Sequence, residues 1–368
     1  MMKVLITGSD GFIAKNLRER LQRNENIKLY LFSKDDSLDI LEAYLKEVDF
    51  VYHLAGVNRP KDNEEFYEGN TNLTRFIVDV LKKNKKAIPI VLSSSTQALQ
   101  DNDYGKSKLQ AENIVLDYSK EFFVNSYVFR LPNIFGKWSK PNYNSVISTW
   151  CYNISHNIDI QINDEKYTMD LVYIDDVVDE FVQCLFLDRK SGYSEVSTVY
   201  VKTLGEIRDL LLEFKENRNS LVISNVGSGF ERALYATYLS YLDTDDFSYK
   251  LNGHKDDRGT FYEILKTKDA GQFSLSTTKP GITRGNHYHN TKNEKFLVIQ
   301  GKALIEFRHI FSDEIISYEV SSDNMEIVEM IPGYTHNITN IGDDELLLFL
   351  WANEQFDSKN PDTYFLKV

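Results

Sequence analysis

The first half of the chain alternates short apolar runs with longer stretches in which apolar residues recur at helical spacing. Up to about residue 190 this alternation predicts strands and amphipathic helices in turn, and hence a Rossmann-like, doubly wound parallel α/β sheet. The predicted strands are Lys3–Thr7, Lys28–Phe32, Phe50–Leu54, Ile88–Ser93 and Asn125–Phe129. The predicted helices are Phe12–Arg23, Asn70–Lys82, Lys106–Glu121 and Leu204–Arg218.

After Asp256 the apolar residues fall into strand-length segments separated by Gly, Asn and Asp turns, with no helical period between them. This part of the chain therefore predicts an all-β sandwich or barrel. We interpret the aromatic and acidic stretch Tyr235–Tyr249 as the hinge, and we expect domains at residues 1–243 and 250–368. The predicted strands are Phe261–Lys266, Gln272–Thr277, Lys295–Gln300, Lys302–His309, Ile315–Val320, Met325–Met330, Ile338–Asn340 and Leu346–Ala352.

The composition of the 368 residues, 42% hydrophobic and 26% charged, suits two globular domains of ordinary size. Lysine and arginine number 42 against 55 aspartates and glutamates, which gives a net charge of −13. Such a surface repels nucleic acid and anionic lipid, so we expect neither as a partner. Only two cysteines occur, and neither an export signal nor an apolar run of membrane-spanning length is found. We therefore expect a cytoplasmic protein.

A glycine-containing turn follows the first predicted strand. Residues Thr7 to Ala14 read Thr-Gly-Ser-Asp-Gly-Phe-Ile-Ala and lead into a predicted helix. Gly8 permits a tight strand-to-helix turn, and Gly11 lets the backbone approach a pyrophosphate at the helix N-terminus. This context predicts a dinucleotide site. The residues expected to contact the cofactor here are Gly8, Asp10, Gly11, Phe12 and Ile13.

The end of the second predicted strand bears on which nicotinamide cofactor binds. A carboxylate at this place binds the ribose 2′-OH of NAD, whereas the Ser33 hydroxyl and the Lys34 ammonium suit the 2′-phosphate of NADP. The neighbouring Asp35 and Asp36 leave NADH as the alternative. We expect NADPH.

A Tyr-x-x-x-Lys pair predicts the catalytic centre of the first domain. Tyr104 and Lys108 are four residues apart and therefore share one face of a helix. A tyrosine hydroxyl titrates near ~10, and a neighbouring ammonium lowers that pKa. Ser95 ends a predicted sheet strand, where its hydroxyl can hold a substrate carbonyl. We expect Ser95, Tyr104 and Lys108 to be catalytic.

Together these residues resemble the extended short-chain dehydrogenase/reductase family that acts on sugar nucleotides. Further matches are His53–Gly56, Asn70, Arg130–Gly136 and Tyr173–Asp176. The resemblance implies that Asp39 and Ile40 flank the adenine and that Asn133 meets the sugar nucleotide. It also places Leu54, Ala55 and Gly56, with Tyr104 and Lys108, at the cofactor.

One departure from that family narrows the reaction. Its 4,6-dehydratases carry an acidic pair directly after the catalytic Ser or Thr, and that pair runs the elimination. Here Ser95 is followed by Thr96 and Gln97, which cannot act as acid or base. The reactions that remain for the first domain are reduction and epimerisation.

The second domain carries a metal-ligand pattern. His287 and His289 alternate on a strand and share a face, Glu294 follows, and His336 lies in a later segment. Three imidazoles and one carboxylate suit Zn²⁺, Fe²⁺, Mn²⁺ or Ni²⁺. The spacings G-x5-HxH-x4-E-x6-G and G-x2-H-x3-N resemble the two motifs of the cupin superfamily.

The same domain also resembles the sugar-nucleotide 3,5-epimerases, in segments 257–263 and 281–288. By this resemblance Arg258 and Arg284 contact the substrate. In those enzymes the histidine that matches His287 is a base and no metal is present, whereas here His289 and Glu294 complete a metal site. The identity of the general base is therefore undecided, and the candidates are Lys292, Tyr334 and His309.

Over the whole chain the two halves, with segments 292–298 and 361–366, resemble a family of bifunctional capsular-polysaccharide enzymes. The resemblance implies that the cupin epimerises C3 of a UDP-2-acetamido-2,6-dideoxy-4-hexulose. The first domain then reduces C4 with NADPH, which gives UDP-N-acetyl-6-deoxy-L-talosamine on the route to UDP-N-acetyl-L-fucosamine. It also implies zinc and a homodimer.

Two other readings remain at this stage. One is a 4-epimerase that holds NAD tightly and uses the cupin only for dimerisation. The other makes the cupin a structural or sugar-binding barrel without catalysis. Net consumption of NADPH tests the first, and a metal assay tests the second.

Overall fold

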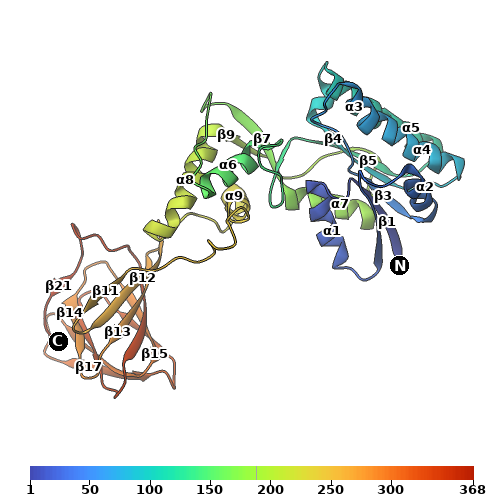
Figure 1. Cartoon of the computed structure of the whole chain (residues 1–368). Helices are drawn as coiled ribbons and strands as arrows, with labels where there is room; N and C mark the ends of the chain where they lie inside the picture. Colours follow the sequence, from blue (N-terminus) through green and yellow to red (C-terminus); the bar gives the residue numbers. More distant parts are fainter. Residues whose placement is uncertain (188) are drawn as a thin grey trace. The chain divides into compact units, whose positions relative to one another are not determined.

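In the computed structural model, residues 1–187 and 189–368 are described, and they form two compact units. The first unit contains residues 1–211 and 228–242, and the second contains residues 212–227 and 243–368. Figure 1 shows that the first is α/β and that the second consists mainly of strands. Among the described residues, no helix has the length and apolar character needed to cross a membrane.

The first unit is built on a six-stranded parallel sheet in the order β2-β1-β3-β4-β5-β8. Its strands are β1 (Met2–Thr7), β2 (Ile27–Phe32), β3 (Phe50–His53), β4 (Ile90–Ser95), β5 (Ser126–Leu131) and β8 (Gly192–Ser194). Its helices are α1 (Phe12–Gln22), α2 (Leu38–Glu47), α3 (Glu64–Phe66), α4 (Leu73–Lys83), α5 (Asp103–Phe122), α6 (Val146–Ser155), α7 (Ile174–Phe186) and α9 (Gly229–Leu239). The five predicted strands are confirmed within two residues at each end.

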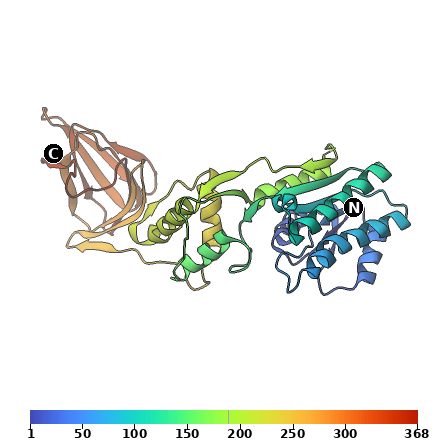
Figure 2. The same ribbon diagram turned by 90° about the horizontal axis from the view of Figure 1, so that it is seen from above.

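The two faces of this sheet bury different side chains because successive strand residues point in opposite directions. Val4 and Ile6 pack with α1 and α7, whereas Leu5 packs with α2, α4 and α5. Helices therefore cover both faces (Figures 1 and 2). Burial on both faces explains why the strands are almost continuously apolar. Because β1, β3 and β4 run parallel, their carboxyl ends lie at one edge of the sheet.

Several elements of the first unit were not predicted, among them α2, α6, α7, α9 and β8. The predicted helix Asn70–Lys82 has a π-helical first part, η1 (Tyr67–Asn72), before α4 begins. A small sheet of β6 (Asn133–Phe135), β7 (Thr168–Tyr173) and β9 (Tyr200–Thr203) also forms. All three strands are partly exposed, and β6 and β9 are also short, so they lack the apolar signal of the central strands.

The predicted hinge Tyr235–Tyr249 is wrong for its first residues, because Tyr235 to Leu239 lie inside α9. Phe230, Leu234 and Tyr238 recur at four-residue spacing and are all buried, so they form one apolar face of this helix. The predicted helix at Leu204 is confirmed as α8 (Leu204–Ser220).

The described part of the chain from Gly253 onward is all-β, as predicted, and with β10 it forms the two sheets of the second unit. One has the order β10-β12-β13-β20-β15-β18 with β11 paired to β12, and the other has the order β17-β16-β19-β14-β21. Side chains of both sheets, including Phe296, Val298, Ile305 and Ile338, form one buried core. Its strands are β10 (Val222–Ile223), β11 (Gly253–Asp256), β12 (Gly259–Thr267), β13 (Gln272–Thr278), β14 (Thr283–Tyr288), β15 (Glu294–Gln300), β16 (Lys302–His309), β17 (Ile315–Ser321), β18 (Ile327–Met330), β19 (Tyr334–Asn340), β20 (Leu346–Ala352) and β21 (Tyr364–Phe365).

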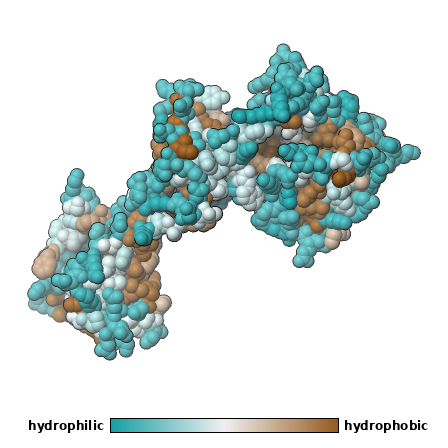
Figure 3. Space-filling model, viewed as in Figure 1, coloured by the Kyte–Doolittle hydropathy of each residue, from teal (hydrophilic) through white to brown (hydrophobic). Residues whose placement is uncertain are grey.

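Hydrophilic residues cover most of the surface visible in Figure 3, as the net charge of −13 suggests. Apolar residues nevertheless reach the surface of the second unit. Ile315 and Tyr318 on β17 are 52% and 47% exposed, and Ile327 on β18 is 59% exposed. Both strands lie at the end of their sheets.

Candidate active site and metal centre

An open cleft of about 1160 Å³ lies at the carboxyl ends of the central strands of the first unit. Most of the predicted cofactor and catalytic residues line it together. They are Gly8, Asp10, Gly11, Phe12, Ile13, Ser33, Lys34, Leu54, Ala55, Gly56, Ser95, Tyr104, Lys108 and Asn133. Asp39 and Ile40 lie elsewhere, exposed in the first turn of α2, so the structure does not bring them to this cleft.

The glycine turn has the geometry of a phosphate cradle. Gly8 has a φ of +65°, and a Cβ atom there would lie 2.8 Å from the Cα of Ala55. The Gly11 N–H donates to the Gly8 carbonyl at 2.8 Å, and α1 begins directly after Gly11 without a side-chain cap. The first N–H groups of α1 are therefore open to an anion such as a pyrophosphate.

Gly8→Ala is expected to destabilise this unit by about 1–3 kcal/mol and to weaken nicotinamide-cofactor binding, because it combines a strained φ with a backbone clash. Cofactor titration and thermal unfolding measure the two effects. Gly227→Ala is the matched control, since a Cβ at Gly227 meets no atom within 4 Å. Equal behaviour of the two variants would contradict the cradle assignment.

Tyr104, Lys108 and Ser95 meet in the same cleft. The Asn102 side chain caps α5 by accepting the Gly105 N–H at 2.8 Å. Tyr104 and Lys108 lie one turn apart in the first part of this helix. Burial raises the pKa of Tyr104, and its hydrogen bond with Ser95 opposes that shift. The Lys108 ammonium is itself buried and donates to the Ser93 carbonyl at 2.7 Å. Burial lowers the pKa of Lys108 to about 8.

The pKa of Tyr104 thus moves opposite to the direction expected from a neighbouring ammonium, because burial raises it by more than the hydrogen bond with Ser95 lowers it. The neutral phenol is the favoured form. A neutral phenol that hydrogen-bonds Ser95 is suited to donate a proton rather than to accept one.

Asn70 links three parts of this cleft, a role that its position at a helix start did not reveal. Its side-chain amide donates to the Val57 carbonyl and to the Ser107 hydroxyl, each at 3.0 Å, and its oxygen accepts the Val57 N–H at 3.0 Å. Asn70 lies in η1, and such π-helical turns occur often at functional sites. This side chain therefore holds the loop after β3 against α5, beside Lys108.

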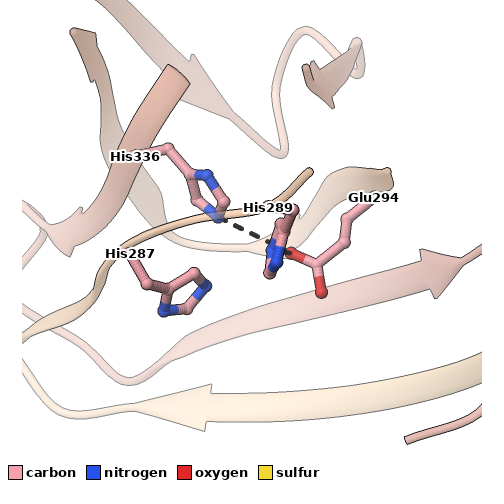
Figure 4. A group of neighbouring side chains, drawn as sticks. All are labelled: His287, His289, Glu294 and His336. Atoms are coloured by element: carbon pink, nitrogen blue, oxygen red, sulfur yellow. Dashed lines mark ion pairs between the residues drawn. The ribbon is translucent and has the colours of Figure 1, made fainter. Parts of the chain in front are cut away.

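In the second unit, all four predicted ligands converge (Figure 4). His287 is on β14, His289 follows one residue after that strand, Glu294 begins β15 and His336 is on β19. A β-bulge at Asn286, where φ is +62°, sets His287 opposite His336. One ligand atom from each residue lies within 4.8 Å of the others, and the His289 and His336 Nε2 atoms are 3.5 and 3.6 Å from the same Glu294 oxygen.

The chemistry of this cluster fits a divalent cation. Nε2 of His289 and both ring nitrogens of His336 are buried without a hydrogen-bond partner among the described residues. Burial lowers the pKa of His287 to about 4. Burial would raise the pKa of Glu294, but His289 and His336 outweigh it and hold that pKa well below its usual range. A neutral His287 imidazole beside an ionised Glu294 carboxylate suits a transition-metal ion.

The three candidates for the general base have different surroundings. The buried Lys292 ammonium donates to the Pro361 carbonyl and to the Thr363 hydroxyl, at 3.0 and 3.1 Å. The Tyr334 and His309 rings pack edge to face with centroids 5.0 Å apart. Tyr334 precedes His336 by two residues on β19, so both side chains point to the same face of the sheet.

The two predicted substrate arginines meet at one carboxylate. Arg258 forms an ion pair of 2.6 Å with Asp256, and an Arg284 nitrogen lies 3.6 Å from the same side chain. Arg284 also donates to the Thr278 hydroxyl at 3.0 Å. These contacts hold the Arg258 and Arg284 guanidinium groups together beside Asp256, at the end of β11.

Two family models match the chain. Residues 4–193 match the NAD dependent epimerase/dehydratase family, and residues 254–364 match the polysaccharide biosynthesis C-terminal domain. The first match contains the cleft residues from Gly8 to Asn133, and the second contains all four candidate metal ligands.

Relatives match over the whole length. A UDP-2-acetamido-2,6-beta-L-arabino-hexul-4-ose reductase of Pseudomonas aeruginosa is 47% identical, across 100% of this chain and 99% of that protein. The crystal structure of the capsular polysaccharide assembling protein CapF from Staphylococcus aureus has a TM-score of 0.93 at 48% identity, and all of both chains is covered. These findings confirm the predicted kinship with capsular-polysaccharide enzymes.

The first unit also has more distant structural neighbours. A UDP-glucuronic acid 4-epimerase from Bacillus cereus matches 65% of this chain and 98% of its own, with a TM-score of 0.55 and 18% identity. This likeness shows the fold alone.

Proposed function

Since the chain belongs to the NAD dependent epimerase/dehydratase family and also carries the polysaccharide biosynthesis C-terminal domain, we propose that it is a bifunctional sugar-nucleotide enzyme of capsule synthesis. Its substrate is a UDP-2-acetamido-2,6-dideoxy-4-hexulose. The second unit, a cupin, inverts C3, and the first unit reduces C4 with NADPH to UDP-N-acetyl-6-deoxy-L-talosamine. The observation that carries this proposal is that one chain contains both a cleft with the Ser95, Tyr104 and Lys108 side chains and a cluster of metal-ligand side chains.

In the reduction, the nicotinamide cofactor supplies the hydride when it is bound. Ser95 and Tyr104 donate hydrogen bonds to the C4 carbonyl oxygen, and Tyr104 gives its proton to that oxygen as the negative charge develops. Lys108 stabilises the tyrosinate that remains, from its place one turn along α5. Asn70 keeps this part of the cleft in place through its bonds to Val57 and Ser107.

In the epimerisation, the C3 proton next to the ketone leaves and returns on the opposite face. His287, His289, Glu294 and His336 would hold the metal, which we take to be zinc. When bound, the metal acts as a Lewis acid that stabilises the enediolate. Tyr334 and His309 are directly opposite partners on β19 and β16 and lie on the same face as His336, so both stay candidates for the base, whereas the Lys292 ammonium is bonded to Pro361 and Thr363.

The stoichiometry of NADPH tests this function. With the purified protein and the 4-keto substrate, we expect one NADPH oxidised per sugar nucleotide and a product whose C4 carries a hydroxyl, as identified by NMR. A C4 ketone that stays unreduced with no NADPH consumed would show that the proposed reductase is wrong.

Lys34→Ala is expected to lower kcat/KM for NADPH by about tenfold and to leave kcat/KM for NADH unchanged, because a charge-assisted bond to the 2′-phosphate is lost. Lys34 lines the cleft after β2, where that phosphate would lie. Steady-state kinetics with both cofactors measure the ratio. Lys46→Ala, at the end of α2, is the control. An equal loss with NADPH and NADH would exclude a 2′-phosphate role for Lys34.

A further inference from the structure

The C-terminal segment Pro361–Val368, which we call the tail strap, lies against the metal-ligand strand. Within it, β21 pairs with β14 so that Phe365 faces His287 and Tyr364 faces Tyr288. The Leu366 N–H donates to the Asn286 carbonyl at 3.0 Å, directly at the β-bulge. The strap therefore continues the sheet beside β14, the strand that carries His287 (Figure 1).

One contact of the strap reaches a metal ligand directly. Nδ1 of His289 lies 2.6 Å from the backbone carbonyl oxygen of Asp362. A carbonyl oxygen can only accept, so Nδ1 carries a proton in this contact and Nε2 is the nitrogen left for a metal. That Nε2 is the atom directed at the ligand cluster, 3.5 Å from the Glu294 carboxylate. The strap thus selects the tautomer that a metal needs.

The Asp362 side chain fixes the loop between two ligands. Its carboxylate accepts the backbone N–H groups of Asn290, Thr291 and Lys292 at 3.0, 2.8 and 2.8 Å. Burial would raise the pKa of Asp362, but these bonds outweigh it and hold that pKa well below its usual range. The residues so held span the gap from His289 to Glu294, and this gap sets how far apart the two ligands lie.

We propose that the tail strap is a positioning element of the metal centre, in which Asp362 orients His289 and spaces it from Glu294. Asp362 offers no atom to the metal and acts only through these residues. Groups that orient metal-ligating histidines in this way are worth about 10–100-fold in metal affinity. The inference rests on the proposed metal centre but not on the proposed reaction.

The test measures metal affinity rather than activity. Full-length protein is loaded with Zn²⁺ and its dissociation constant is measured by competition with a chromogenic chelator, and Co²⁺-substituted protein reports ligand geometry through its absorption spectrum. Asp362→Ala is compared with Asp357→Ala. Asp357 is a matched control because it caps the Lys359 N–H in the same C-terminal region, with no bond to the loop 290–293 among the described residues.

We expect Asp362→Ala to weaken Zn²⁺ binding by about 10–100-fold and to change the cobalt spectrum, Asp362→Asn to be intermediate, and Asp357→Ala to match the wild type. Wild-type affinity with an unchanged spectrum in Asp362→Ala would overturn the proposal. If Asp362→Ala does not fold, Thr363→Val decides. It removes one of the two partners of the Lys292 ammonium and the hydroxyl that lies 3.5 Å from Nδ1 of His289, so we expect weaker binding, and wild-type affinity would overturn the proposal. A wild type that binds no Zn²⁺ would instead overturn the metal centre, and this inference with it.

Discussion

Replacement of Tyr104 by Phe is expected to lower the rate of C4 reduction by about 10²–10⁴-fold, because the oxygen at C4 then lacks its proton donor. The neutral phenol of Tyr104 hydrogen-bonds Ser95 in the cleft, and burial favours that protonated form. Phenylalanine keeps the ring, which packs against Phe66 with centroids 5.4 Å apart, so the fold and the cofactor cleft are expected to persist.

The loss is measured as NADPH oxidation under saturating substrate. Tyr67→Phe is the matched control, since it removes a tyrosine hydroxyl that donates to Asp103 at 3.0 Å at the start of the same helix α5. Exchange of the C3 proton is expected to be unaffected in both variants, because that step belongs to the second unit. Near-wild-type reduction by Tyr104→Phe would show that another group protonates the oxygen.

The second large effect concerns the metal. His336→Ala is expected to abolish stoichiometric Zn²⁺ binding and to slow C3 proton exchange by at least about 100-fold, because Lewis-acid stabilisation of an enediolate is worth several kcal/mol. His336 is buried, and its Nε2 lies 3.6 Å from the Glu294 carboxylate at the centre of the cluster. Metal analysis and NMR measure the two losses.

His254→Ala is the control for that variant, since His254 is an exposed histidine on β11 of the same unit. Removal of the metal from the wild type by a chelator should reproduce the effect of His336→Ala, and re-addition of Zn²⁺ should reverse it. Reduction of a substrate already inverted at C3 should proceed in both. Exchange that continues at the wild-type rate in metal-free protein would contradict the role of the metal.

The apolar pattern predicted the central sheet well because its strands are buried on both faces and are therefore apolar throughout. The small sheet of β6, β7 and β9 escaped prediction because its residues are half exposed and their pairing joins segments far apart in the chain. The stretch 235–249 lies between the two predicted domains and was therefore interpreted as a hinge, but its tyrosines pack: Tyr238 lies with Leu234 on the buried face of α9.

The candidate sites were predictable where chemistry constrains spacing. His287, His289 and Glu294 are close in sequence, and Tyr104 and Lys108 are one helical turn apart, so the pattern alone places them together. The tail strap was not predictable, because its role depends on the backbone carbonyl of Asp362, and a carbonyl has no sequence signature. Asp39 and Ile40 were placed by resemblance, and in the structure they lie outside the cleft.

The raised pKa of Tyr104 shows a second limit of prediction from the sequence. A Tyr-x-x-x-Lys spacing says which groups are near each other, but not how deeply they are buried. Lys108 is buried and faces the Ser93 carbonyl, and burial dominates the pKa shifts of both side chains. Only the packing of α5 against β4 settles which influence prevails.

Solvent exchange at C3 tests the account most directly, because it separates the two activities of one chain. The Zn²⁺-loaded protein is incubated with the 4-keto sugar nucleotide in D₂O without NADPH, and the C3 position is followed by NMR. The account predicts that deuterium enters C3 in the wild type and in Tyr104→Phe, and that none enters with His336→Ala or with metal-free protein. Absence of deuterium at C3 in the wild type, or its continued entry without the metal, would contradict a metal-dependent C3 epimerase joined to a reductase.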